Sequence, residues 1–200
     1  MNPLIKKLWV ITIVCCLLPL VLLFIDVLFD DLGANPIRTL HFRLGDWSLR
    51  FLYLTLAITP IQVITEWRGL ANYRQLFGLF AFFYATLHVL VYLLVDHALA
   101  WPIIGTDIFE STYLWFGLLA YLIVFLLALT SSKWAKKQMG KNWKKLHRLI
   151  YIAAVAAIIH YFMQLKANLA EPLLYSIIVA VLLSFRVLVW LKVTIKRFRR

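Results

Sequence analysis

Six apolar stretches alternate with short polar segments along the 200-residue chain. They cover residues 8–29, 47–64, 76–95, 113–130, 146–165 and 172–191. Each is close to the ~20 residues that an α-helix needs to cross ~30 Å of hydrocarbon. Because these stretches use most of the chain, the pattern predicts an all-α membrane protein. We expect a single domain over residues 1–200, built as a six-transmembrane-helix bundle.

The composition agrees with this pattern. The chain is 64% hydrophobic, with a mean hydropathy of +0.85, whereas soluble domains are ~45–50% apolar. Lys6 and Lys7 before the first stretch are typical of a signal peptide, but the stretch is too long for one and no small-residue cleavage site closes it. We therefore expect a retained first helix.

The net charge of +12 is distributed asymmetrically. Basic residues precede the first stretch, separate the second from the third and the fourth from the fifth, and end the chain: Lys6, Lys7, Arg68, Arg74, Lys133, Lys136, Lys137, Lys141, Lys144, Lys145, Arg148, Lys196, Arg197, Arg199 and Arg200. The opposite loops carry Asp30, Asp31, Asp46, Asp96, Asp107 and Glu110. Since cytoplasmic loops are enriched in lysine and arginine, both termini are predicted to be cytoplasmic. The basic side then meets anionic lipid headgroups rather than nucleic acid.

Other polar positions lead to smaller expectations. Residues 30–46 are typical of an outward-facing loop, and the Thr59-Pro60 pair should kink or end the second helix. Arg186 is close enough to the end of the sixth stretch for its side chain to snorkel. No internal repeat is visible, and no G-x-G-x-x-G motif indicates a nicotinamide dinucleotide site.

Two histidines are the strongest chemical feature of the chain. Counted from the inner ends of the third and fifth helices, His88 lies ~20 Å and His160 ~21 Å along the axis, at ~1.5 Å per residue. They are therefore level with each other in the outer half. A titratable ring in hydrocarbon indicates a functional site, and two facing histidines are what a six-coordinate b-type haem requires as iron ligands. Hydrogen-bonded interior rings are the plainer alternative.

A third histidine, His147, lies at the inner end of the fifth helix. It points ~140° away from His160 around an ideal helix, and no histidine near Gln75 is available to pair with it. The surrounding cations favour an anionic or polar redox group. We expect His147 to serve electron input, at a quinone or flavin site or as a ligand of a second haem, although an interfacial histidine without a role is the alternative. His41 and His97 are expected to be solvated loop residues.

Four segments carry a resemblance to a known family. They are Gly33-Ala34-Asn35-Pro36; Gly45 to Pro60, ending Ile58-Thr59-Pro60; Arg74-Gln75-Leu76-Phe77-Gly78-Leu79 running to Thr86-Leu87-His88; and Gly140-Lys141-Asn142-Trp143 through Leu146-His147-Arg148-Leu149-Ile150-Tyr151 to His160-Tyr161. In order and spacing these segments resemble the ferric-reductase-like transmembrane superfamily. Within it, nearly the whole chain is similar to the MsrQ (YedZ) family.

The resemblance implies a function that the composition does not give. Members of this family are haem-binding membrane subunits of bacterial protein-methionine-sulfoxide reductase systems in the inner (plasma) membrane. It implies haem b and FMN as cofactors, and electrons that pass from the quinone pool to a periplasmic molybdopterin-containing methionine-sulfoxide reductase that repairs oxidised proteins. By position, His88 and His160 match the haem-iron ligands, and His147 matches the inner histidine.

The chain is thus expected to be an electron-transfer subunit without catalytic residues of its own. Ferric reductases and NADPH oxidases of the wider superfamily continue into a cytoplasmic flavin- and nicotinamide-binding domain, whereas this sequence stops at Arg200. We expect that it does not draw hydride from NAD(P)H alone. Two alternatives stay open: another quinone-linked cytochrome b or stand-alone ferric reductase, and a non-redox membrane scaffold or transporter.

Overall fold

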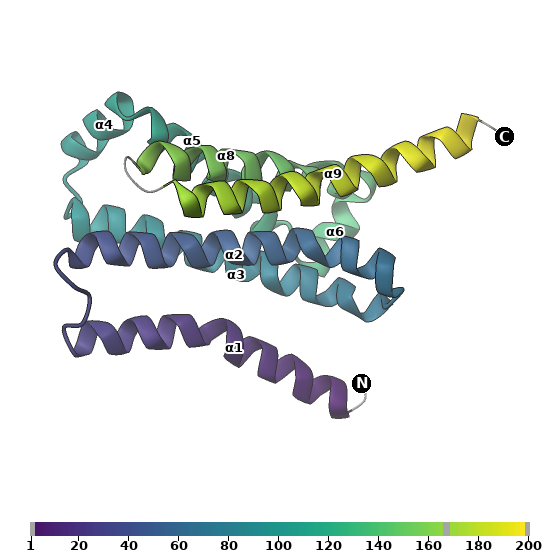
Figure 1. Cartoon of the computed structure of the whole chain (residues 1–200), viewed down its shortest axis with the longest axis horizontal. Helices are drawn as coiled ribbons and strands as arrows, with labels where there is room; N and C mark the ends of the chain where they lie inside the picture. Colours follow the sequence, from purple (N-terminus) through teal and green to yellow (C-terminus); the bar gives the residue numbers. More distant parts are fainter. Residues whose placement is uncertain (1–2, 166–168, 199–200) are drawn as a thin grey trace.

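The computed structural model describes residues 3–165 and 169–198, which form helices and no strand. Figure 1 shows the long helices running side by side. The elements in chain order are α1 (Pro3–Leu28), α2 (Pro36–Thr65), η1 (Arg68–Leu70), α3 (Ala71–Leu90), a π-helical turn η2 (Val91–Asp96), α4 (Trp101–Glu110), α5 (Thr112–Leu129), α6 (Lys133–Met139), α7 (Lys141–Leu146), η3 (His147–Leu149), α8 (Ile150–Gln164) and α9 (Ala170–Phe198).

Six helical runs within the described residues are long and apolar enough to cross a membrane: Lys7–Leu28, Pro36–Thr65, Ala71–Asp96, Thr112–Leu129, Lys141–Gln164 and Ala170–Val189. The predicted all-α, multi-pass architecture is therefore confirmed. α1 begins and α9 finishes at the end of the bundle that carries α6, and α4 lies at the opposite end (Figure 1). We call these the α6 end and the α4 end. Arg199 and Arg200, two of the predicted cytoplasmic charges, lie outside the described residues.

Four helices form the centre of the bundle. α2, α3, α5 and α8 pack in a ring in that order, while α1 lies outside against α2, and α9 lies against α2 and α8. Rings on α2 and α3 fill one side of the centre, where Phe51 contacts Phe77 and Tyr84. On α8, Ala153 and Ala154 are fully buried. Their small side chains let neighbouring helices approach closely, which is how helices associate in lipid. α3 and α8 face each other across the ring.

α2 begins eleven residues earlier than the apolar pattern indicated. The Asn35 side chain accepts a hydrogen bond of 3.0 Å from the backbone N–H of Arg38, and Pro36 opens the helix. An asparagine cap followed by proline is a strong helix start. The predicted loop over residues 30–46 was therefore wrong from Pro36 onward, and His41, Gly45 and Asp46 lie on a helix.

Pro60 lies inside α2, which continues to Thr65, so the helix does not end there. Because proline has no N–H, the carbonyl of Leu56 loses its helical donor. Arg186 of α9 supplies a donor from outside: its guanidinium donates to the Leu56 carbonyl at 3.1 Å and to the Tyr151 hydroxyl at 2.6 Å. The prediction that Arg186 snorkels to the membrane surface was wrong, because its side chain turns into the bundle.

Candidate functional site

The structure brings His88 and His160 together across the ring of helices. Their ring centroids are 6.3 Å apart and their planes are nearly perpendicular, at 85°. His88 lies near the end of α3 and His160 near the end of α8, both toward the α4 end. The two residues predicted to be level with each other are thus in a position to act on one group.

Each imidazole is held by a backbone carbonyl of a neighbouring helix. The Nδ1 atom of His88 lies 2.9 Å from the carbonyl oxygen of His41, and Nδ1 of His160 lies 2.8 Å from that of Tyr113. A carbonyl can only accept, so each Nδ1 carries the proton and each Nε2 keeps a lone pair. A metal-binding histidine has this arrangement, in which the hydrogen bond fixes the tautomer and the orientation of the ring.

A glycine lies beside each of the two rings. A methyl group on Gly117 would lie only 2.8 Å from Nδ1 of His160, and one on Gly45 would lie 3.4 Å from Nδ1 of His88. The first distance is shorter than any ordinary contact, whereas the second is tight. These helices therefore approach the imidazoles closely because they carry no side chain at those two positions.

The carbonyl, the glycine and the histidine recur as a set. Both hydrogen bonds join residues 47 positions apart, and each member of the second set lies 72 positions after its counterpart in the first. The α2–α3 pair and the α5–α8 pair thus supply the same ligand arrangement twice. No repeat is visible in the sequence, and this relation becomes apparent only from the contacts in the structure.

The pair suits a metal that brings its own remaining ligands. An imidazole nitrogen bonds a transition metal at about 2 Å, so two rings on opposite sides of one ion have centroids about 6 Å apart. Within residues 3–165 and 169–198, no group of three or more His, Cys, Asp and Glu could hold a metal ion. Haem iron needs only two protein ligands, since the macrocycle supplies the others. The residues present therefore fit a bis-histidine haem.

His147 is not brought to this pair. It lies on η3 at the α6 end, where its ring stacks on Trp143 with centroids 3.9 Å apart and its Nε2 lies 3.1 Å from Oγ1 of Thr130. Its counterpart 72 positions earlier is Gln75, whose amide donates to the Ser131 carbonyl at 3.0 Å. Gln75 and His147 thus both contact residues at the end of α5, but only His147 offers an imidazole.

His41 is a residue whose position sequence reasoning missed. Its ring packs against that of His88 with centroids 5.1 Å apart, and its Nε2 lies 3.4 Å from a carboxylate oxygen of Asp96. Only 13% of its side chain is exposed. The prediction of a solvated loop residue was wrong because His41 belongs to α2.

His97 is also more enclosed than predicted. It follows the π-helical turn that extends α3, and its Nε2 lies 3.5 Å from a carboxylate oxygen of Asp107 on α4. The Tyr92 hydroxyl donates to the same oxygen at 2.7 Å. α4 is thereby tied to the end of α3, next to the histidine pair.

The chain matches known proteins over most of its length. The ferric reductase like transmembrane component family matches residues 44–158, a range that includes His88 and His147 and ends two residues before His160. A protein-methionine-sulfoxide reductase heme-binding subunit MsrQ from Rhodospirillum rubrum is 42% identical over 174 residues, covering 86% of this chain and 84% of the relative. The chain belongs to the MsrQ family.

Further MsrQ relatives agree. The protein of that name from Xanthomonas oryzae pv. oryzae is 39% identical over 84% of this chain and 76% of its own length. The one from Brucella ovis is 41% identical over 78% of this chain and 70% of its own length. The predicted resemblance to the MsrQ family and to the wider superfamily is therefore confirmed.

Proposed function

We propose that this MsrQ-family chain is a membrane electron-transfer subunit that holds one haem b between His88 and His160. The observation that carries the proposal is the pair of imidazoles 6.3 Å apart, each with Nδ1 bound to a carbonyl and Nε2 left to bind iron. The relatives, which are named heme-binding subunits of a protein-methionine-sulfoxide reductase, support it.

The ligand set determines the kind of chemistry. When bound, the haem supplies a one-electron redox centre. With two imidazoles on the iron no coordination position is open to substrate, so electron transfer suits the site better than sulfoxide chemistry. The His41 and Tyr113 carbonyls hold the rings in the ligating tautomer. Catalysis then belongs to a partner, and the chain is not the catalytic subunit.

The charges at the two ends of the bundle support a proposed orientation in the membrane and, with it, a direction of electron flow. The α4 end carries the acidic residues Asp30, Asp31, Asp96, Asp107 and Glu110, and the α6 end carries most of the bases. By the positive-inside rule the α4 end faces the periplasm and the α6 end the cytoplasm of a bacterial inner membrane. The histidine pair near the α4 end suits delivery of electrons to a periplasmic molybdopterin-containing methionine-sulfoxide reductase. The quinone pool is the proposed donor.

His147 has a separate part in this proposal. Its ring lies on Trp143 beside Lys136, whose ammonium is 5.0 Å from the centroid of the Trp143 ring. Aromatic faces with nearby cations suit a flavin phosphate and its ring system. We propose that Trp143, His147 and Lys136 at the α6 end bind the FMN that the family resemblance implies. The alternative is that His147 is a ligand of a second haem.

The histidine pair is tested by substitution. His88→Ala and His160→Ala should each remove most of the bound haem from protein that still inserts in the membrane, because one axial bond is lost. The absorbance of the purified protein near the Soret maximum, with haem extraction, measures this. His97→Ala is the matched control, since it removes an enclosed histidine of the same end that is not a ligand. Normal low-spin spectra in both ligand variants would contradict the proposal.

A further inference from the structure

A cavity of about 390 Å³ lies between α1 and the bundle, at the depth of the histidine pair. Residues of α1 give it an apolar wall, including Leu22, while the opposite wall carries Asp46, Trp47 and Arg50 of α2. Asp46 directly follows Gly45, the residue packed against His88. The cavity is therefore separated from the proposed haem site by little more than α2 itself.

The polar wall is unusual for this depth. A guanidinium nitrogen of Arg50 lies 3.8 Å from a carboxylate oxygen of Asp46, and 18% of the Asp46 side chain is exposed. Arg50 also donates to the Tyr175 hydroxyl at 2.9 Å and lies 4.7 Å from the centroid of a ring of Trp47. Charged groups within a membrane are costly, and they mark sites where a substrate or a proton is handled.

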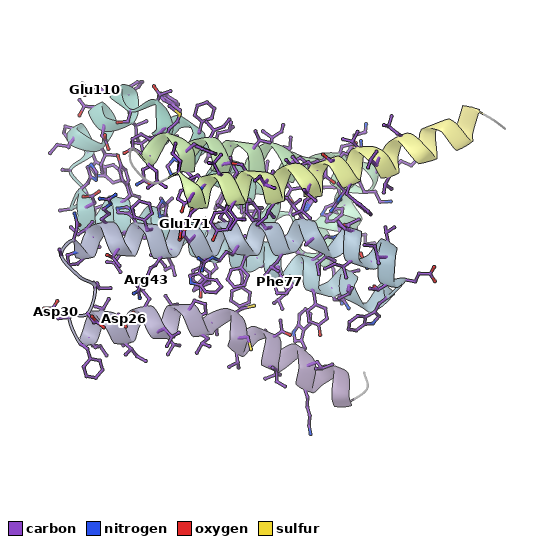
Figure 2. The ribbon with its side chains drawn as sticks, in the orientation of Figure 1. Asp26, Asp30, Arg43, Phe77, Glu110 and Glu171 are labelled. Atoms are coloured by element: carbon purple, nitrogen blue, oxygen red, sulfur yellow. The ribbon has the colours of Figure 1, made fainter. Side chains whose placement is uncertain are left out.

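The charges around the cavity are balanced. Arg43, which also lines it, is paired with Asp26 of α1, and Arg50 is paired with Asp46. Figure 2 shows Arg43 and Asp26 facing each other between the two helices. A balanced wall does not favour a phosphodiester anion, which Asp46 would repel. It offers instead a hydrogen-bond acceptor and a donor to a neutral polar head attached to an apolar tail.

A polar path leads from Asp46 to the α4 end. The Tyr161 hydroxyl interacts with the Asp46 carboxylate and donates to a carboxylate oxygen of Glu171 at 3.0 Å. Tyr161 and Glu171 line a second cavity, also of about 390 Å³, together with Arg38 and Arg43 at the start of α2. Arg43 lines both cavities. Side chains therefore connect the first cavity, between α1 and α2, to the second cavity at the α4 end.

We propose that the cavity between α1 and α2 is the site where a membrane hydroquinone binds and is oxidised. This inference rests on the proposed function, because the haem between His88 and His160 is the electron acceptor. Asp46 accepts a hydrogen bond from a ring hydroxyl, Arg50 donates to the other ring oxygen, and the apolar tail lies along α1.

The reaction balances as one hydroquinone giving one quinone, two protons and two electrons. Both O–H bonds of the ring break. The Asp46 carboxylate would take the protons in turn and release them through Tyr161 and Glu171. A haem held by His88 and His160 would accept the electrons one at a time, passing the first to the partner before it takes the second. Quinol input then occurs in the half of the bundle near the α4 end, and His147 is left for the flavin or second haem.

Cys15 provides a readout of binding that does not depend on electron transfer. It lines the cavity and is exposed, whereas its neighbour Cys16 is buried. Alkylation of Cys15 in the full-length protein should be slowed by decylubiquinone or by a short-chain menaquinone. Dodecylbenzene and phosphatidylglycerol should not protect it. Equal protection by phosphatidylglycerol would make the cavity a lipid site and overturn the proposal.

Two variants test where the polar head and the apolar tail of the quinone bind. Asp46→Asn should raise the half-protective quinone concentration about tenfold, as expected for a lost hydrogen bond to a charged group. Leu22→Trp should do the same by filling the cavity. Asp31→Asn and Leu28→Trp are the matched controls, because neither residue lines the cavity.

The same variants separate this inference from the proposed function. Asp46→Asn should slow reduction of the haem by decylubiquinol while dithionite still reduces it fully. If the unmodified protein binds no haem, the proposed function fails whatever the alkylation shows. If it binds haem, but both Asp46→Asn and Leu22→Trp leave quinone protection and quinol reduction unchanged, the site is wrong.

Discussion

The two ends of the central helix ring have the same scaffold and different chemistry. At the α4 end, positions 88 and 160 are both histidine, and each ring binds a carbonyl through Nδ1. At the α6 end the corresponding positions are Gln75 and His147, and here it is Nε2 of His147 that lies against Thr130. The first arrangement leaves two Nε2 atoms for one metal, whereas the second leaves neither a second imidazole nor a free Nε2.

Repetition of a helix pair does not by itself produce a second bis-histidine site. Helix pairs α2–α3 and α5–α8 position both ends equally well, but a bis-histidine site needs an imidazole from each pair and an acceptor that fixes each tautomer. Only the α4 end meets both requirements. The acidic and basic ends of the bundle add to the contrast, because in the proposed orientation the histidine pair lies near the side from which electrons are expected to leave.

The largest effect that tests this comparison is expected at Gly117. In Gly117→Ala the added methyl group would lie 2.8 Å from Nδ1 of His160 and 2.9 Å from its Cε1, so the ring must move off its carbonyl. Overpacking of this kind costs roughly 1–3 kcal/mol, which corresponds to about 5-fold to 140-fold weaker haem retention. Haem content after purification and washing measures the change.

Gly45→Ala is the matched control in the other half of the repeat. Its methyl group would lie 3.4 Å from Nδ1 of His88, a distance that a small shift can relieve. Haem retention should fall much less than in Gly117→Ala. Equal losses in the two variants would mean that the glycines act through helix packing rather than through the imidazoles.

Much of the α4-end site could be predicted from the sequence. The constant rise of an α-helix placed His88 and His160 at equal depth, because depth depends only on counting residues from a helix end. What could not be predicted is what holds them. The acceptors are the main-chain carbonyls of His41 and Tyr113, which leave no side-chain signal in the sequence.

The two main errors in the sequence prediction have different causes. Polar residues near the start of α2 suggested a loop, although the Asn35 cap and Pro36 indicate a helix start, and this hid the positions of His41 and Asp46. Arg186 was expected at the membrane surface because its partner, the Leu56 carbonyl, is 130 residues away in sequence. The start of α2 could therefore have been read from local sequence, whereas the contact of Arg186 joins distant segments and leaves no trace in the hydrophobic periodicity.

A smaller effect is expected from His147→Ala at the α6 end. The low-spin haem spectrum should remain, because this residue makes no contact with the pair in the described structure. FMN retention should fall about tenfold through the loss of a stacked and hydrogen-bonded ring. Loss of half the haem in this variant would instead show that the α6 end holds a haem of its own, and the contrast between the ends would be broken.

The smallest effect on haem content is expected at Arg186, whose guanidinium satisfies polar groups in the half of the bundle near the α6 end. Arg186→Met removes the donor to the Leu56 carbonyl and to the Tyr151 hydroxyl, so a carbonyl already deprived by Pro60 loses its replacement partner. An unsatisfied buried acceptor costs roughly 1–3 kcal/mol, and the thermal midpoint should fall while haem content stays unchanged.

Pro60→Ala restores a backbone N–H to α2 and should reduce the cost of Arg186→Met. A double-mutant cycle on the thermal midpoint measures that coupling. If the two substitutions are simply additive, Arg186 does not stabilise the proline break, and its inward position needs another explanation.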